Sequence, residues 1–268
     1  MIALPLPIRA LAAASYVAPR LVAPVFRHLM MHPRPTRWWA LPLAPADARL
    51  EIAPGLVAWR WGEGPRVLLV HGFEGGRQQF AALVAALTAS GFQAIALDMP
   101  AHGDSTGRET NVAEFATATA IRALGPLHAI VAHSMGAATA YAAIAAEGGV
   151  GRLVAFAAPS GFRRVLKGYA RGFGLSRRGA AAFIASVEAR VGRPADDFEL
   201  RNVARDLALP VLLIHDSNDP VVPVVESARA ARLLPQATLR VTRELGHNRP
   251  LADPENVAAV MAFLGRPD

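Results

Sequence analysis

The 268-residue chain contains no cysteine, a single lysine (Lys167), and no acidic residue before Asp47. Without cysteine the chain can form neither a disulfide nor a thiolate metal site. Cysteine usage therefore says nothing about the redox compartment. Positive charge is carried almost entirely by arginine, and the net charge is +7.

The basic residues are concentrated in two segments. Residues 1–46 and residues 160–206 each carry a net charge of +5, so the remainder of the chain carries −3. Neither segment interleaves aromatic with basic side chains in the manner of a nucleic-acid-binding surface. We therefore do not expect a nucleic-acid partner.

The N-terminal segment, residues 1–46, is apolar and basic. Its longest uncharged run, residues 10–19, is much shorter than the ~20 residues of a transmembrane helix. Residues 1–8 carry no basic side chain and two prolines, which is atypical of a signal peptide. We expect one or two short helices in a cytoplasmic protein. These helices either pack on the body of the protein or lie on a membrane surface, and both alternatives stay open.

From Leu50 onward, short apolar runs alternate with helical patterns. The expected strands are 56–62, 66–72, 93–98, 128–133, 152–159, 211–216 and 237–242. The expected helices are 77–90, 111–124, 135–147, 225–234 and 254–264. Continuous apolar strands alternating with helices predict an α/β fold, with a mostly parallel twisted sheet and helices on both faces. The run 56–62 alternates like an edge or antiparallel strand.

One interval breaks this rhythm, because about fifty residues separate the expected strands at 152–159 and 211–216. Its helical periodicity and glycine breaks predict an inserted cap of two or three helices at about 160–206. We therefore expect an N-terminal segment, 1–46, followed by an α/β domain, 47–268, that carries the cap at the carboxyl edge of the sheet, where ligands bind in such folds.

Ser134 stands between an expected strand and an expected helix, in "AHSMG", with Ala132 and Gly136 two residues to either side. A nucleophile elbow requires small residues there because the turn is tight and the helix passes close to neighbouring strands. The alternative is an ordinary serine helix cap.

A glycine-rich turn, "HGFEGG" (71–76), follows the first buried strand. It would present the backbone N–H of Phe73 beside that of Met135, and together they would form an oxyanion hole. The alternative is a plain glycine turn.

Two later loops supply the partners that a serine nucleophile needs. Asp219 follows the strand at 211–216, and His247 follows the last strand. Histidine accepts the serine proton near neutral pH, and a carboxylate fixes the tautomer of the histidine. Asp216 is the alternative carboxylate.

These motifs, in this order, together with "DMPAHGDS" (98–105), resemble the α/β-hydrolase fold family over roughly residues 50–265. The resemblance implies Ser134 as nucleophile, His247 as base, Asp219 as its orienting acid, and the amides of Phe73 and Met135 as the oxyanion hole. Two residues depart from the family pattern: alanine stands at 101 and at 132, where many members have glycine. Because alanine is small, we expect both turns to form.

The sequence thus favours a serine hydrolase that cleaves carboxylic esters of small molecules through a Ser-His-Asp triad and an acyl-enzyme intermediate. A thioesterase or acyltransferase using the same triad, served by the basic residues between 163 and 178, is the main alternative. A non-catalytic binding member of the fold is another. No metal-ligand spacing, P-loop or dinucleotide fingerprint occurs, so no cofactor is expected.

Overall fold

An eight-stranded sheet organises the chain in a computed structural model, which describes residues 5–34, 42–110 and 116–265. The strands run in the order β1-β2-β4-β3-β5-β6-β7-β8. Their bounds are β1 Ala48–Ala53, β2 Leu56–Trp61, β3 Arg66–Val70, β4 Gln93–Leu97, β5 Leu127–His133, β6 Val150–Phe156, β7 Val211–Asp216 and β8 Ala237–Thr242. The pairs β1·β2 and β2·β4 are antiparallel, and every other neighbouring pair is parallel. The expected mostly parallel α/β sheet is confirmed.

Ten α-helices and four short 3-10 helices accompany the sheet in the described residues. The α-helices are α1 Leu6–Ala14, α2 Pro19–Met31, α3 Ala81–Ala89, α4 Ala116–Leu124, α5 Met135–Glu147, α6 Phe162–Gly172, α7 Arg177–Val191, α8 Leu200–Val203, α9 Val225–Leu233 and α10 Pro254–Leu264. The 3-10 helices are η2 Arg77–Phe80, η3 Ala195–Phe198, η4 Ala204–Asp206 and η5 Arg249–Leu251. The first part of the expected helix 111–124, residues 111–115, lies outside the described residues.

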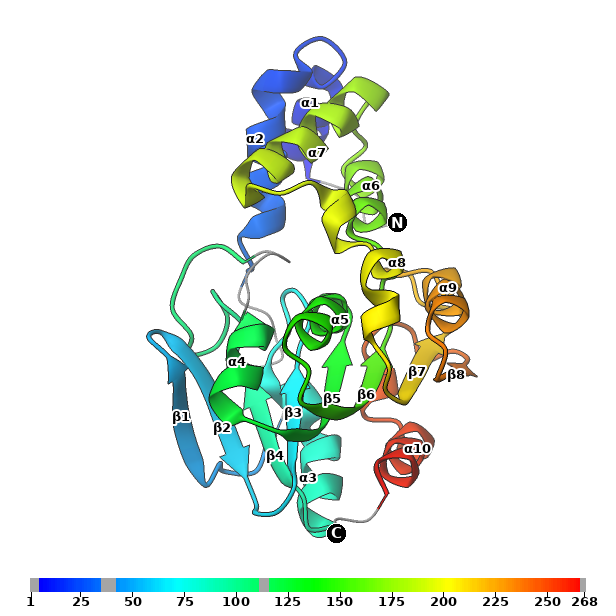
Figure 1. Cartoon of the computed structure of the whole chain (residues 1–268). Helices are drawn as coiled ribbons and strands as arrows, with labels where there is room; N and C mark the ends of the chain where they lie inside the picture. The colour runs from blue at the N-terminus through cyan, green and yellow to red at the C-terminus, as the bar shows by residue number, and fades with distance from the viewer. Residues whose placement is uncertain (1–4, 35–41, 111–115, 266–268) are drawn as a thin grey trace.

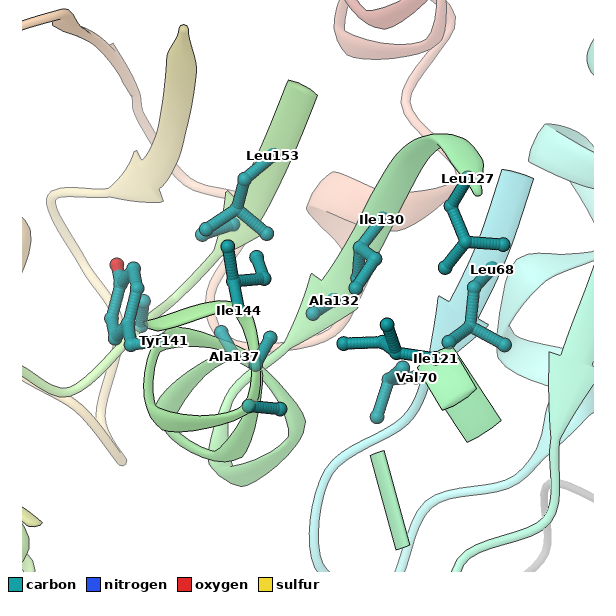
Figure 2. Packing of buried hydrophobic residues seen from close by; sticks show 14 of the residues in the cluster. Leu68, Val70, Ile121, Leu127, Ile130, Ala132, Ala137, Tyr141, Ile144 and Leu153 are labelled. Carbon is teal, nitrogen blue, oxygen red and sulfur yellow. The ribbon is translucent and has the colours of Figure 1, made fainter. Parts of the chain in front are cut away.

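Alternate residues of the central strands point to opposite faces and build two separate cores. Leu68 of β3 and Ile130 of β5 pack with α4 and α5, whereas Leu69 and Val131 pack with α3 and α10. Figure 2 shows the first of these cores, with Val70 beside Ile121 of α4 and Ala132 beside Ala137 of α5. Because both faces of these strands are buried, apolar and polar residues do not alternate along them, and their sequences are continuous apolar runs.

A third core lies apart from the sheet, within the group of helices at the top of Figure 1. The N-terminal helices α1 and α2 form this core together with α6 and α7. Its buried members include Val22, Phe26, Leu166, Phe183 and Val187. The helices of the N-terminal segment and those inserted after β6 thus share one hydrophobic core, and we call these four helices the cap.

A buried pair of serines joins the two parts of the cap. Ser176 donates its backbone N–H to Ser15 Oγ at 3.0 Å and its hydroxyl to the Ser15 carbonyl at 2.8 Å. Ser176 Oγ also accepts the Gly179 N–H at 2.9 Å, so the same side chain caps α7. The turn after α1 is therefore fixed against the start of α7.

Within the described residues, no helix is both long enough and apolar enough to cross a membrane.

Gly136 lies where α5 passes the end of β3. A Cβ there would be 2.5 Å from the carbonyl oxygens of both Val70 and His71. Gly136→Ala should therefore lower the free energy of unfolding by about 1–3 kcal/mol, because neither backbone carbonyl can move aside cheaply. Urea unfolding followed by tryptophan fluorescence measures the change.

Gly168→Ala, in α6, is the matched control, because a Cβ at Gly168 meets no atom within 4 Å. Helix propensity should then dominate and raise the free energy of unfolding by about 0.5–1 kcal/mol. Equal effects of the two substitutions would contradict the packing argument at Gly136.

Candidate active site

Ser134 occupies a strained turn between β5 and α5. Its φ is +54° and its ψ is −120°, a left-handed conformation that a residue with a Cβ rarely adopts. The Ser134 N–H donates to the carbonyl of Phe156 in the neighbouring strand at 2.8 Å. This anchored turn holds the hydroxyl at the carboxyl edge of the sheet.

A chain of hydrogen bonds joins the side chains of Ser134, His247 and Asp219. His247 Nε2 lies 3.1 Å from Ser134 Oγ, and His247 Nδ1 lies 2.7 Å from Asp219 Oδ2. The carboxylate accepts a hydrogen bond from Nδ1–H, so Nε2 carries a lone pair directed at the serine hydroxyl. This arrangement suits a histidine that removes the serine proton.

The Asp219 carboxylate is held from several sides. Its Oδ1 accepts the backbone N–H groups of Val221 and Val222, at 2.8 and 2.9 Å. Burial of the carboxyl opposes ionisation, but the hydrogen bonds from His215 and His247 outweigh it and hold the pKa of Asp219 well below its usual value. Asp219 is therefore ionised at neutral pH and fixed in orientation.

His215, a fully buried residue of β7, is a second histidine beside Asp219. Its Nε2 lies 2.8 Å from the Val222 carbonyl, which can only accept, so Nε2 carries the proton. The same N–H lies 3.4 Å from Asp219 Oδ2. The opposite nitrogen, Nδ1, then accepts the hydroxyl of Ser227 at 2.6 Å. His215 thus supports the carboxylate from the side away from His247.

Asp216, the alternative carboxylate, has different partners. Its Oδ2 accepts the Thr242 hydroxyl at 2.9 Å and the Leu245 N–H at 3.1 Å, and its Oδ1 accepts the Asn218 N–H at 2.9 Å. Within the described part of the chain it makes no hydrogen bond to His247. Asp216 instead ties the loop that carries the histidine to the end of β7.

The glycine-rich turn 71–76 lies directly against Ser134. A Cβ on Gly72 would be 2.9 Å from the Ser134 Cβ, so only glycine permits this approach. His71 fixes the turn, because its Nδ1–H donates to the Gly72 carbonyl at 2.8 Å while its Nε2 accepts the Met99 N–H at 3.1 Å. Phe73 and Met135 both line the adjoining cavity. Ala101, in the neighbouring turn, has a φ of +63°, so alanine adopts there a conformation that favours glycine.

A cavity of about 440 Å³, a volume that includes its mouth, opens beside this turn and beneath the cap. Its lining combines Met135 and Gly136, which directly follow Ser134, with the glycine-rich turn and cap side chains. The apolar members include Met30 of α2, Phe162 and Tyr169 of α6, and Met99 and Met135. Such a lining fits an apolar group attached to the atom that Ser134 would attack.

The sequence-predicted residues Ser134, Asp219 and His247 therefore come together, and Phe73 and Met135 lie beside them. Sequence reasoning missed His215 and Met30. Buried histidines in strands are common, and only the positions of Asp219 and Ser227 distinguish His215. Met30 lies in an N-terminal helix that packs mainly against α7, which is more than 100 residues away along the chain.

Comparisons with known proteins place the fold. The sequence model of the alpha/beta hydrolase family matches residues 67–260, so the chain belongs to that family. This confirms the resemblance found in the motifs. A search of the curated proteins finds no match.

Solved structures of similar fold include several enzymes. An esterase from Pyrococcus furiosus has a TM-score of 0.64 at 20% identity, covering 87% of this chain and 98% of that one. A monoacylglycerol lipase from Paleococcus ferrophilus has a TM-score of 0.61 at 21% identity, covering 78% and 98%. A bromoperoxidase from Bacillus anthracis has a TM-score of 0.61 at 15% identity, covering 81% and 98%. At these identities the likeness establishes the fold alone, and esterase, lipase and bromoperoxidase share it.

Buried histidines near the site make the folding stability of the protein depend on pH. Burial, reinforced by a neighbouring histidine, lowers the pKa of His71 and of His133 to about 3. Both are therefore neutral in the folded protein, whereas in the unfolded chain each takes up a proton near pH 6.5. Their contribution to stability is fully present above pH 6.5 and is lost as the pH falls toward 3.

We expect the free energy of unfolding to fall between pH 6.5 and pH 5 by about 1.4 kcal/mol per pH unit for each histidine at the steepest point. Urea unfolding at half-unit pH steps measures the slope. His133→Gln retains a side-chain N–H for the His247 carbonyl, which His133 Nε2 contacts at 3.0 Å, and should make the slope shallower by the contribution of one histidine. An unchanged slope in this variant would contradict the assignment.

Proposed function

We propose that this protein is a serine hydrolase that cleaves carboxylic esters through an acyl-enzyme intermediate. The observation that carries the proposal is the hydrogen-bond chain from Ser134 Oγ to His247 Nε2, at 3.1 Å, and from His247 Nδ1 to Asp219 Oδ2, at 2.7 Å. A serine hydroxyl becomes a competent nucleophile when a fixed base can take its proton. Membership of the alpha/beta hydrolase family supports hydrolysis as the reaction class.

In the first half of the proposed reaction, His247 removes the Ser134 proton as Oγ attacks the ester carbonyl carbon. The carbonyl oxygen becomes negative and accepts the backbone N–H groups of Phe73 and Met135. Asp219 stabilises the imidazolium that forms on His247. His247 then donates its proton to the alkoxide oxygen, the carbon–oxygen bond breaks, and the alcohol leaves.

In the second half, water replaces the alcohol. His247 removes a proton from the water as the water oxygen attacks the acyl carbon bound to Ser134. Collapse of this intermediate returns the proton to Ser134 Oγ and releases the carboxylic acid. The apolar lining from Met30, Phe162 and Tyr169 supports an acyl group with a hydrocarbon chain as the part that enters the cavity.

The thioesterase and acyltransferase alternative depended on free basic groups in the cap. Two of these groups are already paired with carboxylates. Arg163 contacts Glu188 at 2.8 Å and Asp196 at 2.7 Å. Arg164 lies 3.1 Å from both Glu199 and Glu226. These pairs leave fewer cations for a carrier phosphate, so the simple ester is favoured.

Ser134→Ala tests the nucleophile. We expect wild type to hydrolyse p-nitrophenyl esters, from acetate to palmitate, with an optimum at a chain that fills the cavity, and we expect kcat to fall by about 10⁴-fold or more in the variant. Covalent labelling of wild type by a fluorophosphonate probe, with none in the variant, is a substrate-independent readout. A wild-type protein that neither turns over any ester nor reacts with the probe would instead favour a non-catalytic binding member of the fold.

Asp219→Asn and Asp216→Asn form a matched pair. An amide at 219 can turn its N–H₂ toward His247 and stabilise the wrong tautomer, so kcat should fall by about 10³–10⁴-fold. Asp216→Asn should leave kcat within about threefold but lower the free energy of unfolding by about 1–3 kcal/mol, because Asp216 accepts hydrogen bonds from Thr242 and Leu245. The reverse pattern of activity loss would make Asp216 the orienting acid.

A further inference from the structure

The cap exposes large apolar side chains that its own core does not use. Six of them lie between residues 6 and 29: Leu6, Tyr16, Val17, Leu21, Val25 and Leu29. Val17 and Leu21 are 86% and 80% exposed. Isolated exposed leucines are ordinary, but a cluster on one short helical hairpin indicates a surface that contacts something apolar.

Helix α2 carries two apolar stripes that lie about 100° apart around its axis, because they are offset by one residue. One stripe is buried in the cap core and consists of Val22, Phe26 and Met30. The other has the same four-residue spacing and faces outward: Leu21, Val25 and Leu29. One apolar face is enough to fix a helix to its protein, so the outward stripe needs a separate explanation.

Arginines surround the exposed tip of the hairpin. Arg9 and Arg20 flank Tyr16 and Val17 in sequence, and the serine pair Ser15–Ser176 brings Arg177 and Arg178 to the same end of the cap. All four arginines are exposed. None of them has an ion-pair partner among residues 5–34, 42–110 and 116–265, and the first acidic residue of the sequence is Asp47.

We propose that the tip of the cap, formed by Tyr16, Val17 and Leu21 with the four surrounding arginines, docks on an anionic lipid surface. The apolar side chains enter the boundary between headgroups and acyl chains, while the guanidinium groups bind the anionic headgroups. Exposed apolar side chains with adjacent arginines are typical of segments that bind anionic membrane surfaces.

Charge favours lipid over a second copy of the chain. A two-fold dimer through this face would place the same patch against itself. Each copy would then oppose its arginines to identical arginines, and no carboxylate of residues 1–46 could receive them. An anionic membrane supplies the missing negative charge.

The path of α2 relates this surface to the cavity. The helix begins near Leu21 at the tip and ends near Met30, which lines the cavity, and Figure 1 shows it running down from the top of the cap toward the sheet. Thirteen helical residues span about 20 Å, so docking holds the protein at the surface with the cavity well above the headgroups. The proposal therefore concerns attachment and does not depend on which ester is cleaved.

Vesicle flotation of the full chain tests the proposal. We expect wild type to float with vesicles of equal parts phosphatidylglycerol and phosphatidylcholine, and to stay at the bottom with phosphatidylcholine alone. Val17→Asp combined with Leu21→Asp should weaken binding to the anionic vesicles by about tenfold or more. Val241→Asp, at a half-exposed position of β8 far from the cap, is the matched control and should bind like wild type.

Thermal unfolding of the double variant should resemble that of wild type, because both side chains are exposed and leave the cap core unchanged. Ser134→Ala should float like wild type, so failed catalysis and failed docking are separable. Equal flotation of wild type and the double variant, or none for wild type, would overturn the proposal. A wild-type dimer in light scattering that the double variant converts to monomer, without flotation of either, would assign the surface to a second copy instead.

Discussion

The close contact between α5 and the end of β3 is the constraint on which the candidate site depends. Gly136 brings the helix so near that a methyl group would collide with two carbonyl oxygens of the strand end. Because the helix is this close, Ser134 must turn sharply and accepts a left-handed backbone. Gly72 is needed for the same reason on the other side of the serine. Two glycines and one strained residue thus set how closely α5 and the glycine-rich turn approach the Ser134 side chain.

Buried histidines hold the loops around this turn. His71 bridges the glycine-rich turn to Met99, and His133 Nε2 lies 3.0 Å from the carbonyl of His247. His215 supports Asp219 from behind. Each uses a ring N–H as a donor, and His71 and His215 each use the second ring nitrogen as an acceptor, so one rigid ring joins two groups on opposite sides of it.

The sheet could be predicted from the sequence because its central strands are buried on both faces. The runs at 66–70, 93–97 and 211–216 are apolar at almost every position, and they fall where the sequence analysis expected them. Strand β1 was missed. Its side chains alternate between intermediate and exposed, so Ala48–Ala53 has no apolar run and owes its place to pairing with β2. Strand β2 is antiparallel, as expected, but β1 rather than β2 forms the sheet edge.

Some residues of the candidate site could be predicted from the local sequence, whereas others could be identified only from contacts in the folded structure. Ser134 and the turn at 71–76 are marked by glycine and alanine spacing, which is a local requirement of the backbone. Asp219 and His247 were found by their order and loop positions. Only the three-dimensional contacts show that Asp219, and not Asp216, is hydrogen-bonded to His247, because both acids lie near the end of the same strand. No sequence pattern around His215 or Met30 indicates that either residue lies at the site.

The cap shows why the N-terminal segment is not a removable attachment. Phe26 and Met31 are fully buried, and Phe26 packs in one cluster with Phe183 and Leu166, which come from the insertion after β6. A chain beginning near Ala46 would leave α6 and α7 with an uncovered apolar face and would take Met30 from the cavity lining. If such a shortened chain failed to bind membranes or preferred other esters, a collapsed cap would explain either result. Single substitutions at outward-facing positions, which leave the shared core intact, separate the surface of the hairpin from its structural role.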